Sequence, residues 1–283
     1  MRALCCVALM ATLLVGCGDR SVAPPTVEQG PGDDVGYDPN KDVVLVGGST
    51  WVITGDAQPG ECVYVDETCV KIDDVKRQFC GDANAQADIV IVDGKVVDVI
   101  CYPPKESGVA IDTVTEVKDG QTVLPQNENH TVITFGDETN GKPVKGDVRL
   151  DAEQVALIGN GIDKTIIDGN LTIASNNAKV RGLTVTGNVV FESNANGATI
   201  AFVKVKGNLE IDSNDVTVLG CIVFGNLTCS GNNASLLSNG VGGQLSVTGT
   251  VTACQDNYAF ADANGNFLVD PVEKGAPLTC KAK

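Results

Sequence analysis

Three charged residues in the middle of the chain could carry out acid–base chemistry on a polysaccharide. Glu210 and Asp212 are two positions apart, so both carboxylates lie on the same side of a β-strand, and Asp215 follows at the next corner. Paired carboxylates act as general acid and general base in glycoside hydrolysis. If the protein is an enzyme, these carboxylates and Arg181, the arginine of the regular repeats, are its candidate catalytic residues. A solvated acidic surface explains the carboxylates equally well.

A second group of oxygen-bearing side chains lies near the C-terminus. They occupy positions 1, 3, 5, 9 and 12 of an EF-hand-type loop, which surrounds Ca²⁺ with oxygen ligands: Asp262, Asn264, Asn266, Asp270 and Glu273. The stretch resembles the DxNxNG calcium loops of bacterial surface repeat domains. It departs from them at Phe267, which stands at position 6 where the pattern has glycine. Calcium binding is one expectation, and a plain β-hairpin around Ala263-Asn264-Gly265-Asn266 is the other.

The chain has eleven cysteines. Cys5 and Cys6 belong to a predicted signal peptide and Cys17 to a predicted lipidation site, which leaves an even number suited to an oxidising compartment. We expect disulfides among Cys62, Cys69, Cys80 and Cys101, whose three possible connectivities stay open, and between Cys254 and Cys280. Cys221 and Cys229 are either two buried thiols or a further disulfide. A metal site in the N-terminal group is the rival interpretation, although paired Cys-x-x-Cys spacing is missing and the only histidine, His130, lies elsewhere.

These residues are positioned by a sequence repeat that runs from Gly169 to about Thr248. Each repeat begins at a Gly-Asn or Gly-Gln pair and is 18 residues long, with one two-residue insertion in the second repeat. Apolar residues recur at positions 3 and 5, 10 and 12, and 15 and 17 of the repeat, and residues two apart share one side of a strand. Each repeat therefore predicts three short strands that form one coil of a solenoid.

Asparagine recurs in two columns at the predicted corners. One column contains Asn170, Asn188, Asn208 and Asn226, and the other contains Asn176, Asn194, Asn214 and Asn232. Asparagine tolerates the left-handed backbone of a sharp corner, and stacked amides can hydrogen-bond from coil to coil. We interpret both columns as structural ladders.

The spacing of the inward residues favours a right-handed coil. A left-handed hexapeptide coil needs an inward residue at every sixth position, but that register meets polar side chains at Lys179, Thr199, Thr217 and Ser235. The segment from Val155 to Asn188, VALIGNGIDKTIIDGNLTIASNNAKVRGLTVTGN, resembles the pectin-lyase-like superfamily. The resemblance implies a right-handed parallel β-helix with three strands per coil. It implies little about activity, because the superfamily includes lyases, hydrolases, esterases and adhesins. In its lyases an Arg or Lys takes the substrate proton, the role that Arg181 would have here.

The N-terminus indicates export. The chain opens with MRALCCVALMATLLVGCGDR, whose apolar run from Ala3 to Val15 is typical of a signal peptide and too short for a membrane span. Its ending, Leu-Val-Gly-Cys, resembles the bacterial lipobox, which implies a lipid on Cys17. Gly18 in the second mature position implies the outer membrane. An ordinary secretory signal with an incidental cysteine is the alternative.

The net charge and the composition limit the classes of molecule that the protein is expected to bind. The net charge is −16, so the chain will not bind nucleic acid or an anionic membrane surface through its own field. Hydrophobic residues make up 43%, enough for a core, while aromatic residues make up only 4%, which weakens the case for a sugar-stacking groove.

The predicted organisation has five parts: a signal peptide (1–16), a lipidated cysteine with a disordered tether (17–41), a cysteine-rich N-terminal β region (42–107), a parallel β-helix (108–252) and a C-terminal hairpin cap (253–283). We expect the N-terminal region to be a cap on the N-terminal end of the solenoid, where open strand edges invite aggregation. Ile72 to Phe79 predicts a short helix, and Asp93-Gly94 predicts a hairpin turn.

The sequence thus predicts an all-β protein, a right-handed β-helix of 18-residue coils with disulfide-stapled caps. Its expected role is that of a monomeric, lipid-anchored envelope protein with a structural, adhesive or carbohydrate-binding surface. A polysaccharide lyase or hydrolase is the alternative. A scaffold that polymerises by end-to-end stacking is a third class, against which both predicted caps count.

Overall fold

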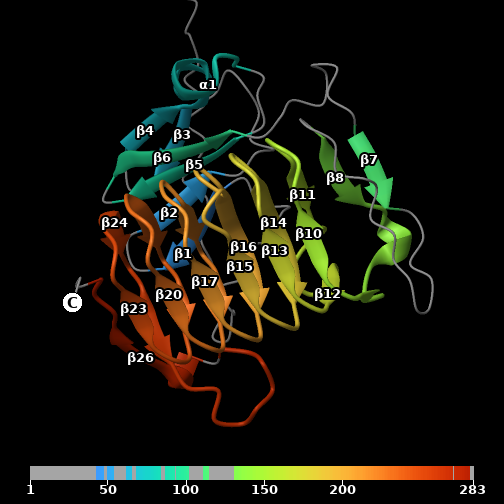
Figure 1. The fold of residues 1–283 in the computed structure, drawn as a ribbon. Coiled ribbons are helices and arrows are strands. Elements are labelled where there is room, and N and C mark those ends of the chain that lie inside the picture. The colour runs from blue at the N-terminus through green and yellow to red at the C-terminus, as the bar shows by residue number, and fades with distance from the viewer. Residues whose placement is uncertain are drawn as a thin grey trace, which may run out of the picture.

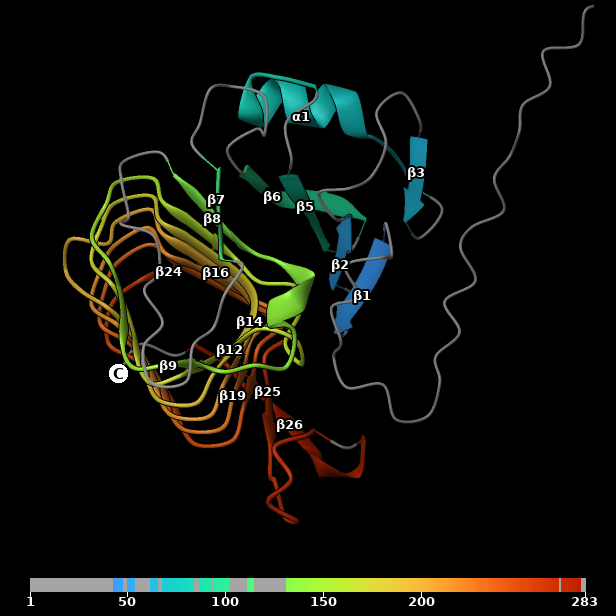
Figure 2. The same cartoon turned by 90° about the vertical axis from the view of Figure 1, so that its right-hand side faces the viewer.

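The computed structural model describes residues 43–47, 50–53, 62–65, 68–83, 87–92, 94–101, 111–114, 131–269 and 271–280. Their strands form a right-handed parallel β-helix with coils about 18 residues apart, beside which lies a separate antiparallel sheet (Figure 1). Figure 2 shows the stacked coils nearly end-on, with this sheet along their side. The predicted all-β class, parallel β-helix and 18-residue coil are confirmed.

The first face of the coil is a six-stranded parallel sheet. Its strands are β10 (Val148–Leu150), β13 (Leu171–Ile173), β15 (Val189–Phe191), β17 (Leu209–Ile211), β20 (Leu227–Cys229) and β23 (Leu245–Val247). Side chains alternate along a strand, so each strand directs its outer two residues inward and its middle residue outward. The predicted column from Leu171 through Val189 and Leu209 to Leu245 is paired in this register.

The second and third faces meet at a corner that two long strands cross, β14 (Lys179–Val185) and β16 (Thr199–Val205). Their first halves belong to the second face, together with β7 (Ile111–Val114), β8 (Val132–Phe135), β11 (Ala156–Ile158), β18 (Thr217–Leu219), β21 (Ala234–Leu237) and β24 (Val251–Gln255). Their second halves belong to the third face, together with β9 (Val144–Lys145), β12 (Ile166–Asp168), β19 (Ile222–Val223), β22 (Gly240–Val241) and β25 (Tyr258–Phe260). Left-handed residues bend the chain between the two faces, as Gly182 does with φ +65° and Phe202 with φ +53°.

The core lies inside the coils. One cluster of buried side chains runs from Ile133 to Val247 and includes Phe191, which is fully buried. Burial of each large apolar side chain contributes roughly 1.5–3 kcal/mol, so neighbouring coils stabilise one another through these columns.

The predicted asparagine ladders are present, with one change of rung. In the first ladder the side-chain oxygen of Asn188 accepts the backbone N–H of Asn208 at 2.8 Å, and the other rungs repeat this bond. In the second ladder Asn196, not the predicted Asn194, bonds to Asn214. The two-residue insertion of the second repeat precedes the ladder position, so the asparagine that occupies it lies two residues later in the sequence. Asn194 instead donates to the carbonyl of Ala174.

The N-terminal region forms a four-stranded antiparallel sheet in the order β1 (Val43–Gly47), β2 (Thr50–Ile53), β5 (Ala87–Val92) and β6 (Lys95–Cys101). A hairpin of β3 (Cys62–Val65) and β4 (Thr68–Lys71) leads into helix α1 (Ile72–Cys80). The helix ends at Gly81, whose left-handed φ of +76° suits a C-terminal cap. The predicted helix and the predicted hairpin of β5 and β6 are both confirmed.

The place of this sheet differs from the expectation. Val52, Val90 and Ile100 pack against outward side chains of the second face, chiefly Leu219 and Leu237. The described strands therefore cover a side of the coil and not its N-terminal end. The physical reason is an apolar outward column on the second face, which needs a partner as much as an open edge does.

The C-terminal segment leaves the last coil as an antiparallel pair of β25 and β26 (Lys274–Pro277), joined by a loop that ends in a 3₁₀ turn, η2 (Pro271–Glu273). Another 3₁₀ turn, η1 (Asp137–Thr139), follows β8. Val269 is buried against Ile222 and Phe260, so the loop folds back onto the third face.

Candidate functional site

The first face differs from the other two in what lies over it. The second face carries the N-terminal sheet and the third face carries the C-terminal loop. The outward side chains of the first face are exposed or half-exposed, and they are mostly polar: Arg149, Thr172, Val190, Glu210, Thr228 and Ser246. This sheet is the candidate functional surface.

The strongest electrostatic feature of this surface is an arginine held by two carboxylates. Arg149 Nη1 and Nη2 donate to the two oxygens of Glu192 at 2.5 and 2.9 Å, and its Nε donates to Asp151 at 2.7 Å. The bidentate bond from Arg149 lowers the pKa of the Glu192 carboxyl, and the same bond is the chief cause of a raised arginine pKa. The network links β10 to the corner after β15, two coils further on.

Arg149 is a residue that the sequence interpretation did not consider. The regular 18-residue repeats begin at Gly169, and Arg149 precedes them in the sequence. The stretch Gly146 to Leu150, GDVRL, nevertheless has the same pattern as GNLTI, and β10 pairs with β13 in that register. Extending the pattern one coil backwards would have placed Arg149 on the outward column.

Arg181 lies away from the first face. It is on β14, where its side chain is nearly buried beneath the N-terminal sheet and its Nη2 is 3.1 Å from a carboxylate oxygen of Asp88. Burial lowers the pKa of Arg181 to about 9, so its guanidinium remains charged at neutral pH. Arg181 therefore has a structural position between two sheets.

Two of the three candidate carboxylates, Glu210 and Asp212, remain on the first face, while Asp215 lies at the corner before β18 (Thr217–Leu219). Glu210 is the exposed middle residue of β17, and Asp212 follows the strand and accepts a hydrogen bond from Ser230 Oγ at 2.6 Å. The structure thus brings Glu210 and Asp212 to one surface and does not bring Arg181 to them.

The C-terminal loop places several of the predicted calcium ligands close together. The carboxylate of Asp262 accepts the backbone N–H groups of Asn266 and Phe267 at 3.1 and 3.2 Å. Glu273 Oε1 accepts the N–H of Ala263 at 3.0 Å, which brings position 12 of the motif back to position 2. Asp270 lies outside the described residues.

Phe267 adopts the backbone conformation that glycine usually supplies. Its φ is +59°, within the left-handed region. The ring of Phe267 packs on Phe224, with centroids 5.1 Å apart, and Lys206 Nζ lies 4.2 Å from its centre. These contacts help to hold a conformation that is strained for a bulky residue.

The disulfides in the structure agree with part of the predicted pairing. Cys80 is bonded to Cys101 and Cys254 to Cys280, while Cys221 and Cys229 are buried free thiols. Burial raises the pKa of Cys221 to about 12, so its thiol is protonated and unreactive at neutral pH. Cys69 is also disulfide-bonded. The side chain of Cys62 lies outside the described residues.

In the part of the chain that the structure describes, no three His, Cys, Asp or Glu side chains are grouped to hold a metal ion. Among the same residues there is no helix with the length and apolar character needed to cross a membrane. The predicted signal peptide, Cys17 and the tether fall outside these residues. Comparisons with protein-family models, with curated proteins and with solved structures found no match to this chain.

Proposed function

We propose that the protein is a lipid-anchored component of a bacterial cell envelope whose β-helix presents the first face as a structural, adhesive or carbohydrate-binding surface. The observation that carries the proposal is the unequal covering of the coil. The chain covers the second and third faces with its own segments, while no segment among the described residues packs on the first face, whose outward side chains are mostly polar. The lipobox resemblance at Cys17 supports the anchor, and the pectin-lyase-like resemblance supports a polysaccharide as partner.

The side chains of this face favour contact with a neutral polymer. Thr172, Thr228 and Ser246 supply hydroxyl groups that donate and accept hydrogen bonds. Glu210 and Asp212 repel polyuronates, and Arg149, the arginine of the face, is already bonded to two carboxylates. A neutral polysaccharide lying along the six strands fits both features.

Retention on immobilised polysaccharides tests this surface. We expect the soluble protein from Val22 to Lys283 to be retained on a neutral polysaccharide and not on a polyuronate. Thr228→Lys should weaken retention several-fold, because it places a long charged side chain in the outward column of the face, between Glu210 and Ser246. Thr279→Lys, a matched exchange at an exposed position of the C-terminal tail, should have no effect.

Three results would contradict the proposal. Equal retention of both variants would show that binding occurs elsewhere, and no retention on any polymer would remove the carbohydrate from the proposal. Release of unsaturated or reducing ends would favour the alternative, a lyase or hydrolase. Loss of that activity in Glu210→Gln would then place its site on the first face.

We also propose that the C-terminal loop binds Ca²⁺. Asp262, Asn264, Asn266 and Glu273 would supply oxygen ligands, and the left-handed conformation of Phe267 is the observation that favours the site. The bound cation would hold the loop closed against the third face.

Calorimetric titration with CaCl₂ checks this proposal. We expect heat of binding with a Kd of about 10⁻⁴–10⁻³ M, the range of extracellular modules, and a raised melting temperature. Glu273→Gln should abolish both effects, whereas Asp256→Asn, outside the loop, should retain them. Heat that persists in Glu273→Gln would place calcium at another site.

A further inference from the structure

The last coil ends in strands whose outer edges are open. Within the described residues, β23 is the final strand of the first face and β24 the final strand of the second face. An open edge presents unpaired backbone groups and is a template for pairing with another chain. Leu245 and Val251 of these strands are only half-buried at the end of the core.

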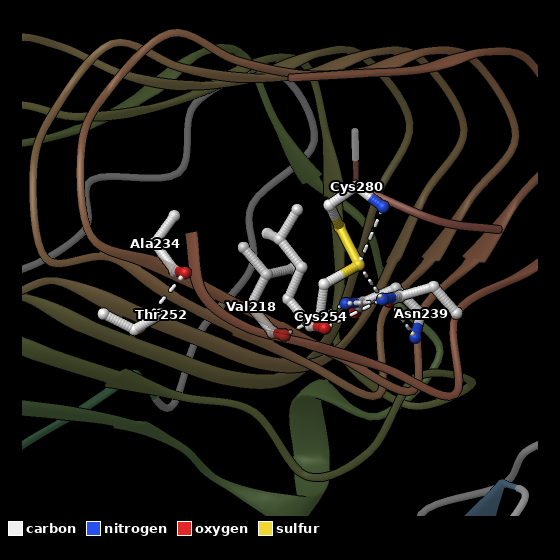
Figure 3. The surroundings of a disulfide bond; sticks show 8 residues. Val218, Ala234, Asn239, Thr252, Cys254 and Cys280 are labelled. Atoms are coloured by element: carbon white, nitrogen blue, oxygen red, sulfur yellow. Dashed lines mark hydrogen bonds between the residues drawn. A yellow bond between two sulfur atoms is a disulfide. The ribbon is translucent and has the colours of Figure 1, made fainter. Parts of the chain in front are cut away.

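A short tail lies over this end. Leu278 and Cys280 pack against the core beside Leu245 and Val251. The N–H of Leu278 donates to the carbonyl of Asn257 at 2.7 Å, and the N–H of Cys280 donates to Cys254 Sγ at 3.1 Å. The Cys254–Cys280 disulfide is the covalent tether of the tail (Figure 3).

The end that the tail covers carries few charged residues. The stretch 225–255, which runs through β20 to β24, contains no Asp, Glu, Lys or Arg, and Asp256 follows at the corner before β25, although the chain has a net charge of −16. At the opposite end, β10 and its flanks carry Asp147, Arg149 and Asp151. Two copies of this acidic chain can therefore meet at their C-terminal ends with little repulsion between charged side chains of their coils.

We propose that the C-terminal end of the coil is a self-association surface, and that its partner is the same end of a second copy of the chain. The tail covers the surface while the Cys254–Cys280 disulfide is intact and uncovers it when the disulfide is reduced. The arrangement is isologous, because each copy contributes the same end of its coil, and it closes as a dimer.

The reductant is a dithiol. One of its thiolates attacks a sulfur of the Cys254–Cys280 bond and forms a mixed disulfide, and its second thiolate then closes a cyclic disulfide. The reductant loses two electrons and two protons, and Cys254 and Cys280 become thiols. Both cysteines are partly exposed, so a small dithiol can reach them.

The test measures molar mass by size-exclusion chromatography with light scattering. The full-length protein, as processed by its host and kept in mild detergent, is compared oxidised and after treatment with dithiothreitol. We expect a monomer when oxidised and a twofold rise in the mass of the protein component when reduced. Cys254→Ser/Cys280→Ser should dimerise without reductant. Cys80→Ser/Cys101→Ser, which removes the other described disulfide, should stay monomeric until it is reduced.

A further variant locates the interface. Thr248→Lys/Gln255→Lys places like charges at the exposed end of the coil and should return the reduced protein to a monomer. Circular dichroism checks that each variant is folded. If the serine variant does not fold, reduced wild type and reduced Cys80→Ser/Cys101→Ser decide. The proposal is overturned if the reduced protein stays monomeric, if the oxidised protein dimerises equally, if open-ended oligomers form, or if the lysine variant still dimerises.

Discussion

Arg181 shows how the role of one residue depends on what lies above it. From the sequence it is a candidate catalytic residue, whereas in the structure it pairs with Asp88 in the contact between the N-terminal sheet and the coil. Both side chains are nearly removed from water, Arg181 at 9% and Asp88 at 0% exposure. A charge in such a place is tolerated only with a partner.

Removal of one member of the pair should therefore be costly. We predict that Asp88→Ala lowers the free energy of unfolding by about 3–5 kcal/mol, because Arg181 loses its partner carboxylate while buried. Guanidinium unfolding measures the change. The double variant Asp88→Leu/Arg181→Met should recover most of the loss. If the single variant is as stable as wild type, the charge of Arg181 is compensated elsewhere.

At the scale of the element, the corners are held by ladders of two kinds. The first asparagine ladder, through Asn188 and Asn208, lies at the surface. A second kind is buried: the side-chain oxygen of Asn239 accepts the N–H of Cys221 at 2.9 Å, and its Nδ2 donates to the side-chain oxygen of Asn257 at 3.0 Å. The same Nδ2 donates to the carbonyl of Val218 at 3.0 Å (Figure 3). The sequence interpretation did not identify this inner ladder, because Cys221 occupies one of its rungs.

The buried ladder should contribute more stability than the exposed one. We predict that Asn239→Ala costs roughly 1–3 kcal/mol for each buried group that it leaves without a partner, including the N–H of Cys221. Asn208→Ala should cost under about 1 kcal/mol, since water can replace an exposed bond. Unfolding midpoints of the two variants provide the comparison. Equal losses would show that the depth of a ladder does not determine its contribution.

For the whole molecule, the main consequence is that the β-helix cannot be separated cleanly from the N-terminal region. The sheet of β1, β2, β5 and β6 covers Ala201, Leu219 and Leu237, which point away from the core of the coil. Without that sheet they form an exposed apolar patch, a common cause of association.

A protein truncated to begin at residue 108 tests this dependence. We predict that it binds a hydrophobic dye and aggregates, because the second face becomes exposed to water. In the truncated protein, Leu219→Thr/Leu237→Thr should reduce both effects by making the patch polar. The same exchanges in the full chain should be destabilising, since they remove contacts with Val52 and Val90. A truncated protein that stays monomeric without dye binding would contradict the prediction.

The coil could be predicted from the sequence because its information is local and repeated. The inward columns follow from spacings of two within a strand and about 18 between coils, and each repeat confirms the next. The pairing of Cys254 with Cys280 followed from their places on either side of a predicted hairpin. The ladder through Asn170 and Asn226 was visible for the same reason.

The surface could be decided only by the tertiary structure, because it depends on segments that do not repeat. Leu219 points outward from the coil, and the packing of the N-terminal sheet determines whether its side chain is exposed to solvent or buried. The bond between Arg149 and Glu192 joins residues 43 positions apart, a separation that no period of the sequence indicates. Phe267 takes a left-handed conformation where it packs on Phe224, a contact between the loop and another coil. Repetition determines the coil, and single long-range contacts determine which of its faces is left for a partner.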